Sequence, residues 1–179
     1  MTTMKSKITL LLLVLGCTVA SPGTLPAAEV GFSYGREMRS HTELEQYEIF
    51  DRHPLPYTAD WGDTVKVSTA VELGAALIHY YGADDAVTGR FSATPMVIVS
   101  PLKNFNILAG LGAGFMVGQT EFNGHDLSGP ILFTGKVGLQ LLLGEKWGIE
   151  YTFFHQSNGS IYDHNDSLNM NQLAVTFRF

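Results

Sequence analysis

Two residues near the carboxy terminus, His155 and Ser157, have the types and spacing of a nucleophile and its base. A serine hydroxyl attacks a carbonyl well only when a base takes its proton, and histidine is the usual base. In a β-strand, side chains at i and i+2 project from the same face, so this imidazole and hydroxyl can meet. Asn158 follows directly, and its amide can donate to a developing oxyanion. The combination indicates acyl transfer, such as ester hydrolysis.

A His-x-Ser pair is a weak motif by itself, because chance produces it often. A surface histidine and serine at the end of a strand, with residues 157–159 opening a turn, account for the same sequence. Which interpretation holds depends on where the neighbouring elements place the pair.

The elements that must position the pair are two alternating segments that close the chain. In residues 147–157, one apolar row of alternating side chains leads directly to His155. In residues 169–179, the matching apolar row extends backwards to Asn169. A hairpin of these two strands brings Asn169 opposite His155, with the parity of a group that orients the imidazole. A polar cluster at the rim of an apolar outer face suits a lipid substrate.

Six further segments with the two-residue period of a β-strand precede this hairpin: 30–34, 47–51, 65–77, 91–99, 105–114 and 131–141. One row holds Val, Leu, Ile and Phe, and the other holds mostly Gly, Ser, Ala, Thr and single charges. A membrane barrel turns such an apolar row toward lipid around a small polar lumen. A secreted β-sandwich or a lipocalin-like barrel would place its large apolar residues inside. The pattern therefore predicts an all-β fold, an eight-stranded antiparallel transmembrane β-barrel of the bacterial outer membrane.

The predicted connections alternate between short ones and longer polar ones. Residues 101–104 and 144–146 are short, whereas the longer ones are 81–89, 120–130 and 158–166. Outer-membrane barrels have short periplasmic turns and longer outside loops, so both termini are expected in the periplasm. His155 and Ser157 are then expected at the outer-leaflet end of their strand.

One segment does not fit this alternation. Residues Arg52 to Asp63 are predicted to form a connection of about a dozen residues, although a short turn is expected there. Pro54 and Pro56 favour this interpretation, since proline is hard to place inside a strand.

The first 28 of the 179 residues have the pattern of a signal peptide, which leaves residues 29–179 as a single barrel domain. Two lysines precede a short apolar run, as is typical of secretory signals. Three processing sites stay open: cleavage after Ala28, cleavage after Ala20, and lipidation at Cys17.

Composition excludes several classes of protein. Removal of residues 1–28 takes away two lysines and no acidic residue, so the formal net charge goes from −6 to −8. Such a chain lacks the basic surface that binds nucleic acid. Cys17 is the only cysteine, so the barrel has no disulfide.

Other residues that could carry chemistry show no suitable pattern. The remaining histidines lack metal-ligand spacing, so no metal and no cofactor are predicted; they are His41, His53, His79, His125 and His164. Asp84 and Asp85 belong to a predicted solvated loop. Three glycines within a strand pattern are expected to relieve crowding in the narrow lumen: Gly110, Gly112 and Gly114.

Around the His-Ser pair, the sequence resembles the lipid A 3-O-deacylase family, the PagL-type outer-membrane acyl hydrolases. The resemblance lies in HQSNG at 155–159, in NDSLNMN at 165–171 and in the closing Phe-Arg-Phe. It implies an eight-stranded barrel with its active site on the outer surface. It also implies hydrolysis of the ester that holds the 3-hydroxyacyl chain at the 3 position of lipid A. Carried over, His155 is the general base, Ser157 the nucleophile and Asn158 an oxyanion contributor.

The resemblance further implies lipopolysaccharide in the outer leaflet as the substrate, with membrane lipid around the barrel. A homodimer is left open.

The chain departs from the family at the third catalytic position. Where the family has a glutamate on the last strand, this chain has Asn169, whose carbonyl accepts the Nδ1 proton but supplies no charge. Asp166 and Asp163 are alternative acids in the preceding loop. The departure motivates a second hypothesis, a non-enzymatic outer-membrane barrel of the structural or adhesin-like kind. A third, an acyltransferase barrel, would need an acyl-donor pocket in the lumen.

Overall fold

The structure is a computed structural model that describes residues 27–38, 44–62, 64–81, 86–122 and 125–179. Most of the predicted signal peptide, with Cys17 and Ala20, lies outside the described residues, as do His41, Asp84 and Asp85. The first strand begins at Glu29, directly after the predicted cleavage site at Ala28.

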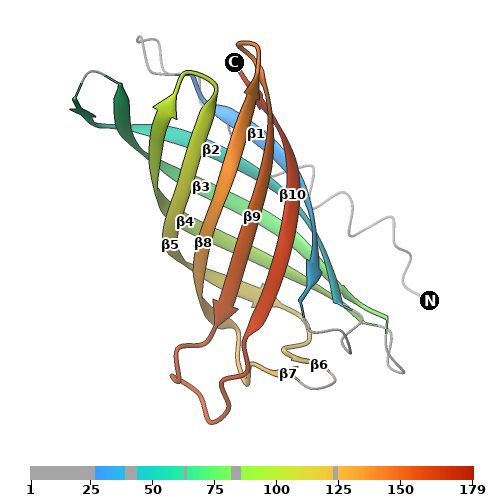
Figure 1. The fold of residues 1–179 in the computed structure, drawn as a ribbon. Helices are drawn as coiled ribbons and strands as arrows, with labels where there is room; N and C mark the ends of the chain where they lie inside the picture. The colour runs from blue at the N-terminus through green and yellow to red at the C-terminus, as the bar shows by residue number, and fades with distance from the viewer. Residues whose placement is uncertain (1–26, 39–43, 63, 82–85, 123–124) are drawn as a thin grey trace.

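The described residues form ten β-strands: β1 (Glu29–Glu37), β2 (Leu44–Trp61), β3 (Val65–Tyr80), β4 (Ala86–Leu102), β5 (Phe105–Val117), β6 (Glu121–Phe122), β7 (His125–Asp126), β8 (Ile131–Leu143), β9 (Trp147–Ser157) and β10 (Leu168–Arg178). In the described chain, eight of them close an antiparallel barrel in the order β1-β10-β9-β8-β5-β4-β3-β2, and β6 pairs with β7 as a separate ribbon (Figure 1). The predicted fold class is confirmed. No helix among the described residues is long and apolar enough to cross a membrane.

The barrel has a turn end and a loop end (Figure 1). The turn end holds both the start of β1 and the end of β10, together with the short connections after β2, β4 and β8. The loop end holds the β6–β7 ribbon and the connection from β9 to β10. Strand β9 therefore runs from the turn end to the loop end and finishes there at Ser157.

The outer surface is apolar because alternate residues of each strand point outward. The exposed row includes Phe32, Leu73, Val97, Ile107, Leu139, Ile149 and Leu173. Such a belt of exposed Val, Leu, Ile and Phe is what an outer-membrane barrel turns toward acyl chains.

Side chains of opposite charge pair inside the lumen. Arg52 contacts three carboxylates, at 2.7 Å from Glu29, 2.5 Å from Glu72 and 3.0 Å from Glu150. The Nζ atom of Lys136 lies 2.9 Å from Glu72 and 3.2 Å from Glu150. These groups are all buried, and they tolerate burial because each charge has an opposite partner.

Apolar side chains close the lumen at the loop end, which the inward row of small and polar residues did not predict. The cluster comprises Leu44, Ile78, Tyr80, Met116, Phe122, Leu127, Leu132, Leu168 and Met170. Phe122 and Leu127 come from the β6–β7 segment, so this segment packs into the barrel mouth as a plug.

The prediction that Arg52 to Asp63 forms a connection is wrong. Strand β2 continues through this segment to Trp61. Its ladder with β3 is interrupted between Pro54 and Thr58, where three residues bulge opposite Thr69. The Thr69 hydroxyl donates to a carbonyl of the bulge at 3.0 Å. The bulge tolerates Pro56 because residues within a bulge make no ladder hydrogen bonds, and Pro54 is the last residue paired before it.

The expectation for the β5 glycines is confirmed. A Cβ at Gly110 would collide with the sulfur of Met96, and a Cβ at Gly112 with the carbonyl oxygen of Ala93. A side chain at Gly110 would therefore require Met96 to move, and one at Gly112 would require the β4 backbone to move.

Candidate active site

His155 and Ser157 lie on the outward row at the loop end of β9. The intervening Gln156 is fully buried in the lumen, as a two-residue period requires. The Nε2 atom of His155 lies 3.2 Å from the Oγ atom of Ser157. The imidazole and the hydroxyl therefore meet on the lipid-facing surface, at the level where the strand gives way to the loop.

Asn169 faces His155 across the pair of strands β9 and β10. The two residues are Cα partners in the ladder, and the Nδ1 atom of His155 lies 2.8 Å from the Oδ1 atom of Asn169. The amide nitrogen of Asn169 donates to the hydroxyl of Ser167 at 3.1 Å. When Oδ1 accepts a hydrogen bond from the Nδ1–H group, the lone pair of Nε2 is left facing Ser157. Ser157, His155 and Asn169 thus form one hydrogen-bonded line.

Asn158 has a different environment from the one its predicted role requires. Its side chain is fully buried, and its amide nitrogen donates to the carbonyl of Leu127 at 2.7 Å and to the carbonyl of His164. Its Oδ1 atom accepts from the backbone N–H of Ser160 at 2.8 Å. The amide nitrogen is thus engaged by the β6–β7 segment and by the loop, and these contacts would have to break before this amide could meet an oxyanion.

The turn after Ser157, which the alternative interpretation of the motif anticipated, is present. Gly159 and Ser160 both have left-handed backbones, with φ of 65° and 64°. The backbone N–H of Ile161 donates to the carbonyl of Asn158 at 3.3 Å and closes the turn. Asn158 therefore anchors the loop directly beside the His-Ser pair.

The two alternative acids lie in the loop, and in the described part of the chain neither forms a hydrogen bond or ion pair with the imidazole. Asp166 pairs with Asp126 of β7: its Oδ2 atom accepts from the Asp126 N–H at 2.9 Å, and its own N–H donates to the Asp126 carbonyl at 3.1 Å. Asp163 is exposed to solvent. Among the described side chains, Asn169 is the one that hydrogen-bonds Nδ1 of His155.

Strand β8 leaves the other side of the imidazole uncovered. Gly135 is the Cα partner of His155, and Phe133 is the partner of Ser157. A Cβ at Gly135 would lie 3.9 Å from the Cβ of His155 and 3.6 Å from Leu111, a side chain that is 79% exposed. An apolar chain can therefore approach the pair sideways along the barrel wall.

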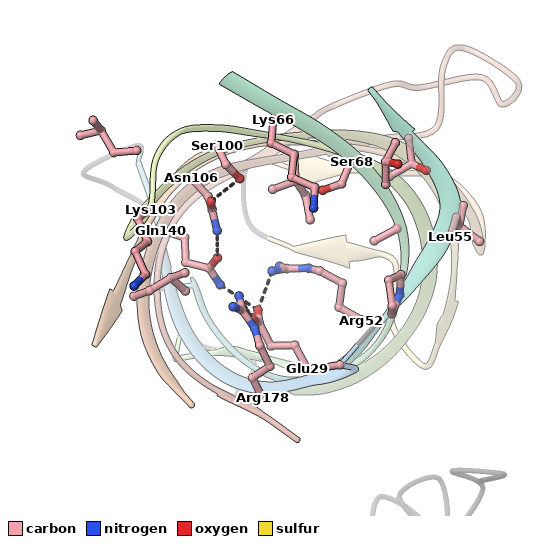
Figure 2. Close-up of a pocket in the computed structure, with 18 of the residues that line it drawn as sticks. Glu29, Arg52, Leu55, Lys66, Ser68, Ser100, Lys103, Asn106, Gln140 and Arg178 are labelled. Atoms are coloured by element: carbon pink, nitrogen blue, oxygen red, sulfur yellow. Dashed lines mark hydrogen bonds and ion pairs between the residues drawn. The ribbon is translucent and has the colours of Figure 1, made fainter. Parts of the chain in front are cut away.

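A cavity lies at the opposite end of the barrel. It has a volume of about 600 Å³ and opens at the turn end, where Glu29, Arg52, Lys66 and Arg178 line it (Figure 2). Its polar side chains form a chain of hydrogen bonds from Ser100 through Asn106 to Gln140 (Figure 2). Since β9 separates this cavity from Ser157 by the length of a strand, it has no part in chemistry at the His-Ser pair.

Three other histidines of the described chain differ in their surroundings. His53 lies 2.7 Å from Asp51, His125 is buried 3.6 Å from Glu37, and His164 is exposed. No group of three or more potential metal-binding side chains occurs among the residues that the structure describes.

Together, the closed barrel and its apolar outer belt define an outer-membrane β-barrel protein, which carries a His-Ser pair on its outward surface. Solved structures with the same fold include the outer membrane enzyme PagL, at a TM-score of 0.70 and 17% identity over 83% of this chain and 97% of that chain. The N-terminal β-barrel domain of Pseudomonas aeruginosa OprF matches with a TM-score of 0.55 and 13% identity, over 87% of this chain and 98% of that chain. The Yersinia pestis outer membrane protein Ail matches with a TM-score of 0.52 and 11% identity, over 86% and 99%.

The structural similarities show the fold alone, whereas the sequence shows the family. The family model for lipid A 3-O-deacylase (PagL) matches residues 45–178, and the chain belongs to this family. A search of curated proteins found no matching relative. The resemblance inferred from the residues around His155 is therefore confirmed.

Proposed function

We propose that this protein is a lipid A 3-O-deacylase, a serine esterase of the outer membrane that removes the 3-O-linked hydroxyacyl chain of lipid A. The observation that carries the proposal is the hydrogen-bonded line of Ser157, His155 and Asn169 on the lipid-facing surface. An ester at the junction of acyl chains and head group is the bond that such a site meets first. Family membership supports the same substrate.

The mechanism follows from the direction of these hydrogen bonds. Ser157 Oγ attacks the ester carbonyl carbon while its proton passes to Nε2 of His155. The tetrahedral intermediate collapses as His155 returns that proton to the departing sugar oxygen, which leaves the acyl chain on Ser157. Water, deprotonated by the same Nε2, then attacks the acyl-serine, and His155 returns that proton to the departing Oγ of Ser157 as the hydroxy acid is released. No cofactor is needed in either half.

Asn169 sets the imidazole for this sequence without adding charge. Its Oδ1 atom accepts from Nδ1 and so holds the tautomer in which Nε2 is the base. It does not stabilise the imidazolium that forms after proton transfer, as a carboxylate would. In serine proteases the change from aspartate to asparagine lowers turnover by about 10⁴. We therefore infer a slow enzyme rather than an inactive one, because here the acceptor faces Nδ1 at 2.8 Å.

The lack of that charge also motivates the second candidate function. A barrel whose third position is Asn169 could have lost catalysis and kept a structural or adhesin-like role. That candidate predicts no consequence for lipid A when His155 or Ser157 is changed.

Mass spectrometry of lipid A separates the two candidates. Lipid A is purified from cells that express the wild-type chain, Ser157→Ala or no barrel. The esterase predicts loss of the mass of one hydroxyacyl chain with the wild type alone. Identical spectra from all three strains, with the barrel present in the membrane fraction, would favour the non-enzymatic candidate.

A further inference from the structure

Arg36 of β1 occupies an unusual place among the cationic side chains of the barrel. It is exposed on the outward row near the loop end of its strand. The other described lysines and arginines lie in the lumen, around the turn-end cavity (Figure 2) or in the turn after β8: Arg52, Lys66, Arg90, Lys103, Lys136, Lys146 and Arg178. Among the residues that the structure describes, Arg36 is thus the one cation on the lipid-facing surface at the loop end.

The cross-strand neighbours of Arg36 are occupied by other groups. Glu45 is its Cα partner on β2. The Glu45 carboxylate accepts hydrogen bonds from three tyrosine hydroxyls, at 2.8 Å from Tyr34, 3.0 Å from Tyr47 and 3.0 Å from Tyr81. On the other side, the partner Asn171 accepts from the hydroxyl of Tyr151 at 3.0 Å.

Arg36 itself forms no hydrogen bond or ion pair with any side chain in the described part of the chain. Tyrosines of this kind form the girdle at the boundary between acyl chains and head groups in membrane barrels. At that boundary a guanidinium needs an anionic partner more than it does in water. The structure therefore presents an arginine whose neighbouring carboxylate is already held, at the level where lipid phosphates lie.

Arg36 also lies near the proposed site of ester hydrolysis. His155 pairs with Asn169, and Arg36 pairs with Asn171 on the same strand β10, so two strand spacings separate them. With strands about 4.8 Å apart and about 3.4 Å per residue along a strand, their Cα atoms are about 12 Å apart. Because the strands tilt, residues that are cross-strand partners do not lie at the same depth: each partner lies closer to the loop end as one passes from β9 to β10 and then to β1. Arg36 therefore lies at about the depth of His155.

We propose that Arg36 binds a phosphate of the lipid A head group and thereby holds the substrate with its ester at Ser157. The inference rests on the proposed deacylase function. A guanidinium presents a planar fork of N–H donors that matches phosphate oxygens, which an ammonium does not. A separation of about 12 Å lets Arg36 reach a different part of the head group from the ester. Arg36 lies outside residues 45–178, which the family model matches.

Kinetics on two substrates test this inference. Purified barrels in mixed micelles of a non-ionic detergent are given lipid A, or lipid A whose phosphates have been removed by a phosphatase. Arg36→Gln should raise KM about tenfold on phosphorylated lipid A and leave kcat unchanged, since a charge-assisted contact used for binding is lost. On the dephosphorylated substrate it should change nothing. Arg36→Lys should recover part of the loss, and Lys146→Gln, the same charge change at the turn end, should have no effect.

The outcomes distinguish this inference from the function on which it rests. A wild-type protein that releases no acyl chain from either substrate contradicts the deacylase itself. An active wild type in which Arg36→Gln changes KM on neither substrate, or equally on both, contradicts the phosphate contact. Adding phosphatidylglycerol to the micelles tests whether Arg36 binds the phosphate of any lipid or that of lipid A in particular. If phosphatidylglycerol inhibits the wild type as strongly as added lipid A does, and does not inhibit Arg36→Gln, then Arg36 binds lipid phosphates in general. That result would contradict a specific contact with the substrate.

Discussion

The Nδ1 atom of His155 and the Oδ1 atom of Asn169 face each other at 2.8 Å across β9 and β10. An amide therefore stands where a carboxylate would complete a charged triad. The amide fixes the tautomer of the imidazole, and a carboxylate would in addition stabilise the imidazolium.

Replacing that amide should speed the reaction. In Asn169→Asp the carboxylate occupies the same position, so we expect kcat to rise at least about tenfold, within a ceiling of roughly 10⁴ set by the serine protease comparison. The measurement is the initial rate of hydroxy acid release from lipid A. Asn104→Asp is the matched control, because it adds the same charge at an exposed position in the turn after β4, at the other end of the barrel. A rate that stays level in Asn169→Asp, or that rises as much in the control, would show that this position does not assist His155.

Side chains added at Gly135 should close the open side of the imidazole. Gly135→Ala places a Cβ at ordinary contact distances from His155 and Leu111, so we expect activity within about twofold of wild type. Gly135→Leu should cover the ring from the lipid side and lower kcat/KM about tenfold or more, without loss of stability. Equal activity of the two variants, both folded, would argue that substrate does not approach along β8.

Asn158→Ala should loosen the loop beside the site. The substitution removes the hydrogen bonds to the carbonyls of Leu127 and His164, and unmet buried hydrogen bonds cost about 1–3 kcal/mol each. We expect faster protease cleavage within residues 158–167, together with lower activity. An oxyanion role for Asn158 predicts a different result: a loss of kcat of about 10²–10³ with the loop as protected as in wild type.

The buried charges of the lumen make a prediction about stability. Arg52→Met leaves the carboxylates of Glu29, Glu72 and Glu150 without their shared partner, and removing one member of such a buried group costs about 3–5 kcal/mol. The free energy of unfolding in urea, followed by the shift in gel mobility of folded barrels, measures this cost. Arg178→Met is the comparison, since Arg178 is half-buried and, among the described residues, forms an ion pair with Glu29 alone. Similar losses for both variants would contradict a central role for Arg52.

The placement of His155, Ser157 and Asn169 could be predicted from sequence because it depends on local rules. A two-residue period decides which row faces outward, and a closing hairpin decides which residues lie opposite each other. Both rules hold for β9 and β10, where His155 pairs with Asn169.

Features that depend on contacts distant in the chain could not be predicted in this way. Asn158 is held by a carbonyl that lies 31 residues earlier, in a segment whose position depends on how it plugs the barrel mouth. Pro54 and Pro56 indicate a break, yet Pro54 still pairs with Ala70, and a bulge opposite Thr69 accommodates Pro56 within the strand. Pairing with a long neighbouring strand outweighs the local preference of proline in this case.

The central claim is that Ser157, activated by His155, breaks an ester of lipid A at the outer face of the barrel. Release of free 3-hydroxy fatty acid from lipid A by the purified protein measures this directly. We predict release by the wild type and by Ser68→Ala, the same substitution at the turn-end cavity, and none by Ser157→Ala. Release by folded Ser157→Ala at the wild-type rate would contradict the claim.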